Sequence, residues 1–332
     1  MRRPGPPTVR SVTLPAPVGG LNTVSPASAM PASDVLWAYN VIPSEMGLSS
    51  RPGYAEHCTG LTGGAVPAVR EVLPFQGSTA AGNRLFATTP TGIWDVTTAS
   101  AAPTQVLAFA TPGGDAGWGV SQSQVTAAGH FLVYADEVNG LHVYTESTGL
   151  WAKVAEGAGV GEVSGVDPGD LVHVVVWKKR LWLTERNSTR VWYLDAGAVF
   201  GAATAFDFGQ QFREGGTLVG CWSWTYDGGS GLDDSLVARS SGGDVAIYQG
   251  TDPTSAGTFG LKGTWALAPP PAGRRICSDA GGDLLLLTRS GIRSVTVEYE
   301  GLAAGLNTRP LTAAGGGPCP RAVRCRAGGG PA

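Results

Sequence analysis

Five segments of the chain share one pattern of hydrophobic and polar positions. Each reads as an apolar strand, a short polar turn, and a second strand in which apolar and polar residues alternate. The segments are RLFATTPTGIWDVT from Arg84, FLVYADEVNGLHVYT from Phe131, RLWLTERNSTRVWYL from Arg180, SLVARSSGGDVAIYQ from Ser235 and DLLLLTRSGIRSVTV from Asp283. Aligned on the first leucine of each (Leu85, Leu132, Leu181, Leu236 and Leu284), they recur at spacings of 47, 49, 55 and 48 residues.

The residues between the paired strands are typical of hairpin turns. The turns fall at Pro90-Thr91-Gly92, Asn139-Gly140, Gly242-Gly243 and Ser290-Gly291, while the third segment turns on Asn187-Ser188 without glycine. Asparagine and glycine tolerate the positive φ angles that short hairpin turns require. Each segment therefore predicts one β-hairpin, and the third is the weakest match.

A period of 40 to 50 residues with paired strands is typical of β-propeller blades. A single hairpin cannot bury its apolar face alone, so successive units have to pack face to face. Further strands are expected at VLAFA from Val106, VHVVVWK from Val172, CWSWTY from Cys221 and GTWAL from Gly263. The sequence thus predicts an all-β, β-propeller-like domain of about five hairpin-based blades over residues 61–300. An ordinary β-sandwich with coincidental spacing is the alternative.

The two ends of the chain differ from the repeated region. Residues 1–60 form a predicted N-terminal arm, rich in Pro and Gly up to Ser28. In this arm Ser33 or Asp34 is expected to cap one helical turn, with Val35, Leu36 and Tyr39 packing inward. Such an arm should either pack across the blades or reach a neighbouring subunit. Residues 301–332 contain no acidic residue and form a predicted low-complexity tail, either disordered or frameshifted.

Composition supports short strands joined by many turns. The chain of 332 residues has 50 glycines and 23 prolines, and only 15% of its residues are charged. So few charges indicate a surface that partners cover in part, and the net charge of −3 gives no basic field that would draw the protein onto nucleic acid. No apolar run approaches the roughly 18 residues of a membrane span. No apolar segment follows the basic opening MRRPGPPTVR, so no signal peptide is expected.

The cysteines indicate neither a disulfide framework nor a zinc site. They are odd in number, scattered and without a CxxC pair: Cys58, Cys221, Cys277, Cys319 and Cys325. Free thiols in a reducing cytoplasm are the expectation.

No catalytic pattern survives inspection. The histidines His57, His130, His142 and His173 form no metal-ligand spacing, and His142 and His173 are expected to be hydrogen-bonded structural residues. Two acid pairs, Asp136 with Glu137 and Asp233 with Asp234, could hydrolyse a sugar if they faced each other about 5 to 10 Å apart. Solvated turn residues are the preferred interpretation of both pairs. Most of the ten tryptophans are expected to fill the core between stacked sheets.

Two stretches of the sequence carry a resemblance to a known family. They read GGLNTVSPASAMPASDVLWAYNVIPSEMGLSSRPGYAEH and VAIYQGTDPTSAGTFGLKGTWALAPPPAGRRICSDAGGDLLLLTRSGI. The first resembles the opening of the tail nozzle and tail-tube proteins of short-tailed bacteriophages, and the second resembles a later stretch of the same proteins. The first stretch matches at Gly19, Gly20, Leu21, Asn22, Thr23, Met30, Pro31, Asp34, Asn40, Pro43, Arg51, Gly53 and Tyr54. The second matches at Gly250, Asp252, Pro253, Gly273, Arg274, Arg275, Gly282 and Asp283.

The resemblance implies a structural protein of the virion tail, assembled in the host cytoplasm, and not an enzyme. It implies a homo-oligomeric ring, expected to be a hexamer, that continues the DNA ejection channel below the portal and adaptor. The expected partners are further copies of the chain, the adaptor or head–tail connector, other tail proteins and transiently passing DNA. No catalytic, cofactor-binding or metal residues transfer from the family. The alternative is a tail-associated propeller that binds or hydrolyses a host-surface glycan.

Overall fold

The structure is a computed structural model of the chain. It describes residues 13, 19–22, 25–44, 47–61, 69–111, 119–227, 232–255 and 257–303. The chain divides into two compact units, residues 1–56 and residues 57–332, and each is described by itself. The predicted boundary between arm and propeller, residue 60, falls four residues after this division.

Five antiparallel sheets, here called blades 1 to 5, follow one another along the second unit. Blade 1 consists of β5 (Glu71–Phe75), β6 (Arg84–Thr89), β7 (Gly92–Asp95) and β8 (Thr104–Ala108). Blade 2 consists of β9 (Gly119–Thr126), β10 (Gly129–Asp136), β11 (Gly140–Thr145) and β12 (Leu150–Lys153). Blade 3 consists of β15 (Leu171–Trp177), β16 (Arg180–Glu185), β17 (Arg190–Tyr193) and β19 (Thr204–Asp207).

Blade 4 consists of β20 (Leu218–Asp227), β21 (Leu232–Ser240), β22 (Asp244–Gly250) and β23 (Phe259–Ala266). Blade 5 has three strands, β24 (Cys277–Asp279), β25 (Leu284–Thr288) and β26 (Gly291–Ser294), and the helix α1 (Val295–Ala303) follows it. A small parallel sheet of β13 (Ala155–Glu156), β14 (Glu162–Ser164) and β18 (Gly201–Ala202) lies outside the blades. Three short 3₁₀ turns are η1 (Ala80–Gly82), η2 (Pro168–Asp170) and η3 (Gly209–Gln211).

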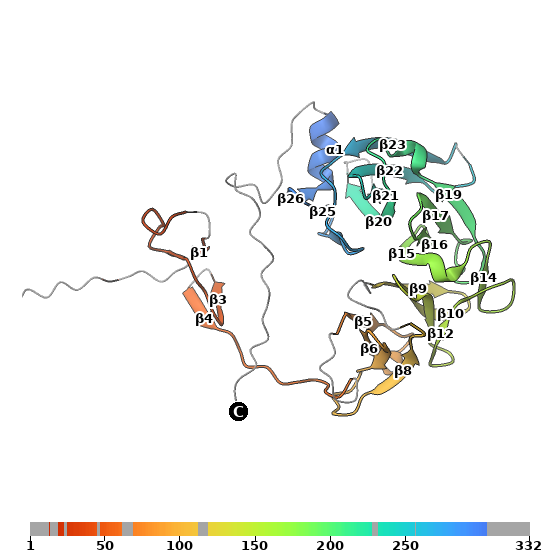
Figure 1. The fold of residues 1–332 in the computed structure, drawn as a ribbon, viewed down its shortest axis with the longest axis horizontal. Helices are drawn as coiled ribbons and strands as arrows, with labels where there is room; N and C mark the ends of the chain where they lie inside the picture. The colour runs from red at the N-terminus through yellow and green to blue at the C-terminus, as the bar shows by residue number, and fades with distance from the viewer. Residues whose placement is uncertain are drawn as a thin grey trace, which may run out of the picture. The chain divides into compact units, whose positions relative to one another are not determined.

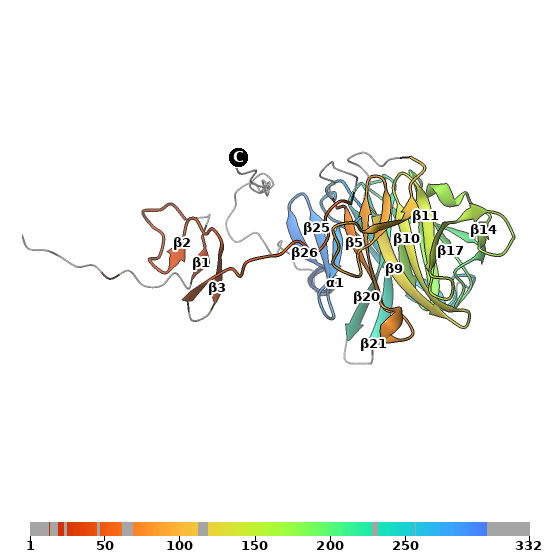
Figure 2. The ribbon, with the colours of Figure 1, turned by 90° about the horizontal axis from the view of Figure 1, so that it is seen from below.

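The blades are arranged around a common centre, so the fold is all-β and β-propeller-like, as predicted (Figure 1). The first strand of each blade lies nearest the centre, and the later strands follow outward (Figure 1). Seen from the side, the strands of the blades run in roughly the same direction, across the thickness of the propeller (Figure 2). This arrangement brings the first strands of blades 1 to 4 together, although they are far apart in the sequence.

The five aligned leucines occupy equivalent places, which confirms the predicted repeat. Each lies in the second strand of its blade, in β6, β10, β16, β21 or β25. Leu132, Leu181, Leu236 and Leu284 belong to the hydrophobic clusters that join their own blade to the preceding one. Leu85 lies on the corresponding face of blade 1, where it packs beside Leu61. We call this side of a blade its leading face and the opposite side its trailing face.

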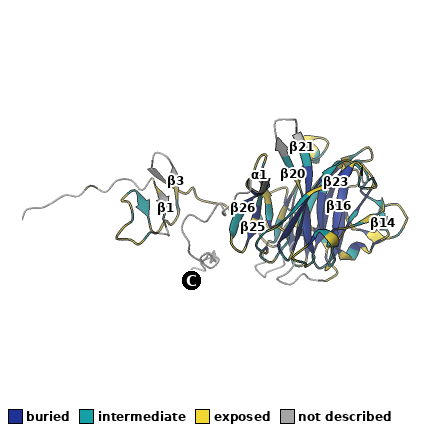
Figure 3. Ribbon diagram, turned by 90° about the horizontal axis from the view of Figure 1, so that it is seen from above, coloured by how far each residue is buried: buried dark blue, intermediate teal, exposed yellow. Residues whose placement is uncertain are grey.

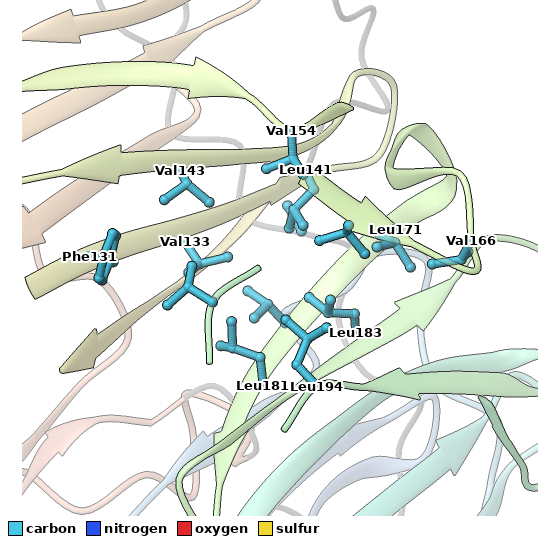
Figure 4. Close-up of a cluster of buried hydrophobic side chains, with 14 residues drawn as sticks. Phe131, Val133, Leu141, Val143, Val154, Val166, Leu171, Leu181, Leu183 and Leu194 are labelled. Atoms are coloured by element: carbon cyan, nitrogen blue, oxygen red, sulfur yellow. The ribbon is translucent and has the colours of Figure 1, made fainter. Parts of the chain in front are cut away.

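The hydrophobic core consists of the layers between successive blades (Figure 3). Alternation along β10 divides its side chains, because Leu132 and Tyr134 face blade 1 whereas Phe131 and Val133 face blade 3. The layer between blades 2 and 3 combines valine and leucine side chains from both sheets (Figure 4). The expected strands at Val106, Val172, Cys221 and Gly263 fall on β8, β15, β20 and β23, although the first ends two residues, and the second and fourth one residue, beyond the observed strand. Trp177, Trp182 and Trp224 are buried in these layers, as predicted for most tryptophans.

The hairpin turns use positive φ angles at the residues that the sequence offers for them. Gly140, Gly243 and Gly291 have φ angles of 78°, 117° and 125°, and Asn187 serves the third hairpin with a φ of 53°. Asn139 keeps a negative φ, so the Asn-Gly turn does not use both residues in the left-handed region. Instead, the main-chain and side-chain nitrogens of Asn139 both donate to Asp136, which closes a three-residue loop.

The C-terminal part of the repeated region differs from its prediction in two ways. The second strand of the fifth hairpin ends at Ser294, and the residues from Val295 form the helix α1 instead of continuing the strand. The Ser294 hydroxyl accepts a hydrogen bond from the main-chain nitrogen of Val297, which is the typical start of a helix. Because α1 runs to Ala303, the predicted tail boundary at residue 301 lies inside a helix. Residues 304–332 lie outside the described part.

The N-terminal unit consists of short strands, and the predicted helical turn after Ser33 is wrong. β1 (Gly20–Leu21) pairs in parallel with β2 (Asp34–Val35), and β3 (Val41–Ser44) pairs antiparallel with β4 (Gly47–Ser50). Asp34 accepts a hydrogen bond from the side-chain nitrogen of Asn22 at 2.8 Å, so it joins two strands instead of capping a helix. Leu36 and Tyr39, expected to pack inward, are 53% and 84% exposed.

Close packing at the centre makes Gly119 sensitive to substitution. A Cβ atom there would overlap the ring of Tyr134, so we expect Gly119→Ala to lower the free energy of unfolding by roughly 1–3 kcal/mol through overpacking. Gly260 in β23 is the matched control, because a Cβ atom there meets nothing within 4 Å. Chemical denaturation of both variants tests this, and equal stabilities would contradict the packing described.

Candidate functional site

The segment between β23 and β24 carries two adjacent arginines to the centre of the propeller. Arg274 holds Glu137 in a two-pronged pair, with its Nε donating to Oε2 at 2.7 Å and its Nη2 donating to Oε1 at 2.9 Å. The Nη1 of Arg274 also donates to the carbonyl oxygens of Leu218 and Val219, at 3.2 and 2.7 Å. Arg274 therefore joins blade 5 to the β10–β11 loop of blade 2 and to the first strand of blade 4.

Arg275 makes the same kind of connection to blades 1 and 2. Its Nη2 lies 2.5 Å from Oε2 of Glu71, the first residue of blade 1. Its Nε donates to the carbonyl oxygen of Gly119, the first residue of blade 2, at 2.9 Å. We call Arg274, Arg275, Glu71 and Glu137 the arginine hub. Guanidinium suits this place because its planar donors satisfy a carboxylate and backbone carbonyls at the same time.

Blade 3 contributes His173 beside this hub. The imidazole is fully buried, and its ring packs edge-on against Trp222 of blade 4 with centroids 4.9 Å apart. Neither ring nitrogen has a hydrogen-bond partner among the described residues. Burial, with a smaller repulsion from Arg274, lowers the pKa of His173 to about 3. The expectation of a hydrogen-bonded histidine is therefore wrong at this position.

Burial also controls the charge of Glu71. It raises the pKa of this carboxyl to about 7, although the Arg275 guanidinium acts in the opposite direction. The Glu71 side chain is only 10% exposed, whereas Arg275 is 39% exposed. The hub thus contains two carboxylates that differ. Glu71 of blade 1, which pairs with Arg275, has a pKa near neutral pH. Glu137 accepts two hydrogen bonds from Arg274.

Three of the four candidate catalytic acids, Asp136, Glu137 and Asp234, form hydrogen bonds or ion pairs with other residues of the chain. Asp136 accepts hydrogen bonds from the main-chain nitrogens of Val138 and Asn139, as expected of a turn residue, but it is buried, so the expectation that it is solvated is wrong. Glu137 is held by Arg274, so the preferred interpretation as a solvated turn residue is wrong for it. Asp234 accepts from Thr225 at 2.7 Å and from Lys178 at 3.1 Å, and the Thr225 bond, aided by Lys178, lowers its pKa. The Asp233 side chain lies outside the described part.

Two of the other histidines, His142 and His57, have hydrogen-bond partners, whereas Nδ1 of His130 has none among the described residues. His142 is buried, and its Nδ1 lies 3.1 Å from the carbonyl oxygen of Gly140, as expected. Burial lowers its pKa to about 4, and the nearby Asp136 opposes that shift. His57 bonds through Nε2 to the carbonyl oxygen of Val96 at 2.8 Å.

A cavity of about 630 Å³ adjoins the hub. Glu137, Arg274, Arg289, Thr217 and Ser241 contribute its polar lining, and Pro270 to Gly273 form one wall. A glycosidase needs two facing carboxyl groups. Among the described lining residues Glu137 is the single carboxylate, and no aromatic ring is present.

The described residues form no metal-binding cluster, no disulfide and no membrane-spanning helix. No group of three or more potential metal ligands occurs within the described residues. Cys58, Cys221 and Cys277, the cysteines in the described ranges, are free thiols, and burial raises the pKa of Cys277 to about 12. Of the helices that the structure describes, none has the length and hydrophobicity to cross a membrane.

The local sequence pattern does not predict the arginine hub. Arg274 and Glu137 are 137 residues apart, and neither belongs to a motif with a known spacing. The useful sign was the family resemblance, which includes Gly273, Arg274 and Arg275 among its matching positions. Other positions of the family resemblance also bond to one another. The side-chain nitrogen of Asn22 donates to Asp34, and the main-chain nitrogen of Arg51 donates to the carbonyl oxygen of Asn40.

Comparisons with known proteins assign no family. No family model matches the chain, and no curated protein matches it. Solved structures similar to it include the extracellular domain of the hybrid two-component system BT3049 from B. thetaiotaomicron, with 16% identity and a TM-score of 0.41. That match covers 68% of this chain and only 28% of the other.

Two further solved structures are similar to about the same share of the chain. BBS1N in complex with ARL6DN has 15% identity and a TM-score of 0.42, covering 74% of this chain and 69% of that one. BamB from Moraxella catarrhalis has 11% identity and a TM-score of 0.37, covering 67% of this chain and 56% of that one. At these scores the likeness carries no argument about what this chain does.

Proposed function

We propose that this chain is a structural subunit of a bacteriophage tail, a nozzle or tail-tube protein that forms part of the DNA ejection channel. The observation that carries the proposal is the role of Arg274 and Arg275, two of the positions at which the chain resembles the family. Arg274 and Arg275 donate hydrogen bonds or form ion pairs to residues of blades 1, 2 and 4, so these two residues hold a scaffold together. A protein that works by its shape requires this kind of internal bracing.

The partners in this proposal are further copies of the chain in a ring of six, the head–tail adaptor and other tail proteins. Passing DNA would make only transient contact, which suits a chain of net charge −3. The alternative, a propeller that binds or hydrolyses a host-surface glycan, would use the cavity beside the hub. Its one described carboxylate, Glu137, is already held by Arg274, so the geometry favours the structural role.

Negative-stain electron microscopy of the purified full chain tests this function. The expected result is closed rings with a central opening, at micromolar concentration and moderate salt. Mass spectrometry of purified phage particles that encode the chain supplies the matching control, because a virion subunit has to be present there in many copies. A chain absent from the particles would contradict the proposal, whatever its oligomeric state.

A further inference from the structure

The first and last blades of the propeller are joined by a different kind of contact from the others. Hydrophobic clusters join blade 1 to blade 2, blade 2 to blade 3, blade 3 to blade 4 and blade 4 to blade 5. None of the clusters formed by described residues combines side chains of blade 1 and blade 5. These two blades meet at the arginine hub, where Arg275, in the segment that leads into blade 5, pairs with Glu71 of blade 1.

Residues of blade 2 cover the carboxyl group of Glu71. The Glu71 side chain is only 10% exposed, and the Ser121 hydroxyl on β9 bonds to it. The charged and titratable groups that act on this carboxyl are Arg275 from the segment before β24, and Asp136 and Tyr134 from β10. Asp136 and Tyr134 are themselves buried. Because these blade 2 residues do not depend on blade 5 for their position, Glu71 remains buried when Arg275 is absent.

The two partners of this ion pair differ in their access to water. The Arg275 side chain is 39% exposed, about four times the exposed fraction of Glu71. A guanidinium at the surface loses little when it leaves an ion pair, because water solvates its charge. A buried carboxylate loses much more, because nothing replaces its counter-charge. Arg275 is therefore the partner that is able to leave, whereas Glu71 has to be neutralised in place.

A proton neutralises Glu71 when Arg275 leaves. Burial raises the pKa of Glu71 to about 7, Arg275 acts against this shift, and the negative charge of Asp136 adds to it. Departure of Arg275 removes the opposing influence, so the open form of the pair has a higher Glu71 pKa than the closed form. The form that binds the proton more tightly is favoured as pH falls. The Ser121 hydroxyl is placed to accept the new O–H of the neutral carboxyl.

We infer that the pair of Arg275 and Glu71 is a proton-operated latch between the first and last blades. The ionised carboxylate holds Arg275, and the protonated carboxyl releases it. The proton comes from the solvent and stays on Glu71, while Arg275 turns into water with its charge unchanged. Arg274 still ties the segment before blade 5 to blades 2 and 4, so release loosens one connection without unfolding the propeller. This inference does not rest on the proposed function, because it concerns only how the propeller closes.

Hydrogen exchange of the full chain, followed by mass spectrometry, tests the latch. Protection is compared at pH 8 and pH 6, after correction for the known effect of pH on the chemical exchange rate. The amides of β5 and β24 should be about tenfold less protected at pH 6, the factor that one unit of pKa difference represents. The amides of β16 in blade 3 serve as the internal reference and should keep their protection, because no part of the latch lies there.

Three variants separate the latch from other effects of pH. Glu71→Gln keeps the size of the side chain without its charge, so β5 and β24 should show the low protection of pH 6 at both pH values. Arg275→Ala should do the same, because the latch has lost its other half. Glu185→Gln is the matched control, since Glu185 also pairs with an arginine, Arg190, but within blade 3. It should keep the wild-type pH dependence of β5 and β24.

A second measurement needs no substitution of Glu71. Carbon-13 labelling of the glutamate carboxyl groups allows each to be titrated by nuclear magnetic resonance, in the wild type and in Arg275→Ala. One carboxyl should titrate with a pKa of about 7 in the wild type. Its pKa should be higher in Arg275→Ala, because the guanidinium no longer favours the ionised form. Circular dichroism checks that each variant folds.

Three outcomes would overturn the inference. Equal protection of β5 and β24 at pH 8 and pH 6 in the wild type would show that no latch opens. A Glu71→Gln variant that keeps the wild-type pH dependence would assign the response to another group. A lower Glu71 pKa in Arg275→Ala would mean that the carboxyl becomes exposed when the arginine leaves, so that acid would close the contact instead. None of these results bears on the presence of the chain in virions, which mass spectrometry of phage particles tests separately.

Discussion

Replacing Arg274 by alanine is expected to lower the free energy of unfolding by about 3–5 kcal/mol, the usual cost of removing one partner of a largely buried ion pair. The substitution leaves Glu137, only 25% exposed, without its counter-charge. It also removes the donor to the carbonyl oxygens of Leu218 and Val219. Urea denaturation followed by circular dichroism measures the effect.

Arg190→Ala is the matched control for this experiment. Arg190 also grips a carboxylate with two donors, at 2.7 and 2.8 Å from the oxygens of Glu185. That pair is local, within blade 3, and the Arg190 side chain is 47% exposed. Its loss is expected to cost about 1 kcal/mol or less, as for surface pairs. Equal effects of the two substitutions would show that the hub braces nothing.

The second large effect concerns pH between 4.5 and 6.5. In this window the unfolded chain binds protons at His142 and His173, whose folded pKa values lie at about 4 and about 3. Stability from a depressed folded pKa is lost as pH falls below the unfolded value of 6.5. Glu71 acts in the opposite sense, because its raised folded pKa of about 7 adds stability as pH falls toward 4.5.

Between pH 4.5 and 6.5 the unfolded state therefore binds two protons, at His142 and His173, whereas the folded state binds one, at Glu71. The free energy of unfolding should therefore fall by about 1.4 kcal/mol for each pH unit of acidification. His173→Leu should make the dependence nearly flat, since one proton then balances one. Glu71→Gln should roughly double the slope. Urea midpoints measured at half-unit steps of pH test this, and identical slopes for the three proteins would refute the assigned protonation states.

The repeated blades could be predicted from the sequence because their determinants are local. Alternation of apolar residues, with Gly or Asn at each turn, identified the five hairpins, and the leucine alignment identified their common leading face. Strands without such a partner pattern were missed. Glu71–Phe75 contains a proline, and Gly119–Thr126 is mostly polar, so only their position in the sheets reveals them.

The hub and the N-terminal unit could not be predicted for physical reasons. The pairing of Arg274 with Glu137 depends on how five blades close around a centre, which no short stretch of sequence encodes. In the N-terminal unit, Ser33 and Asp34 resemble a helix start, but Asp34 is satisfied by Asn22, twelve residues earlier. A contact between separate strands therefore overrode the local preference for a helix cap.

A double-mutant cycle on Arg274 and Glu137 tests the bracing of the blades most directly. The four proteins are the wild type, Arg274→Ala, Glu137→Ala and the double variant, compared by urea denaturation at pH 7.5. Residues that hold one another in a shared network should show a coupling energy of about 2 kcal/mol or more. Additive single effects, with a coupling near zero, would contradict the claim that this pair holds blade 5 to the rest of the propeller.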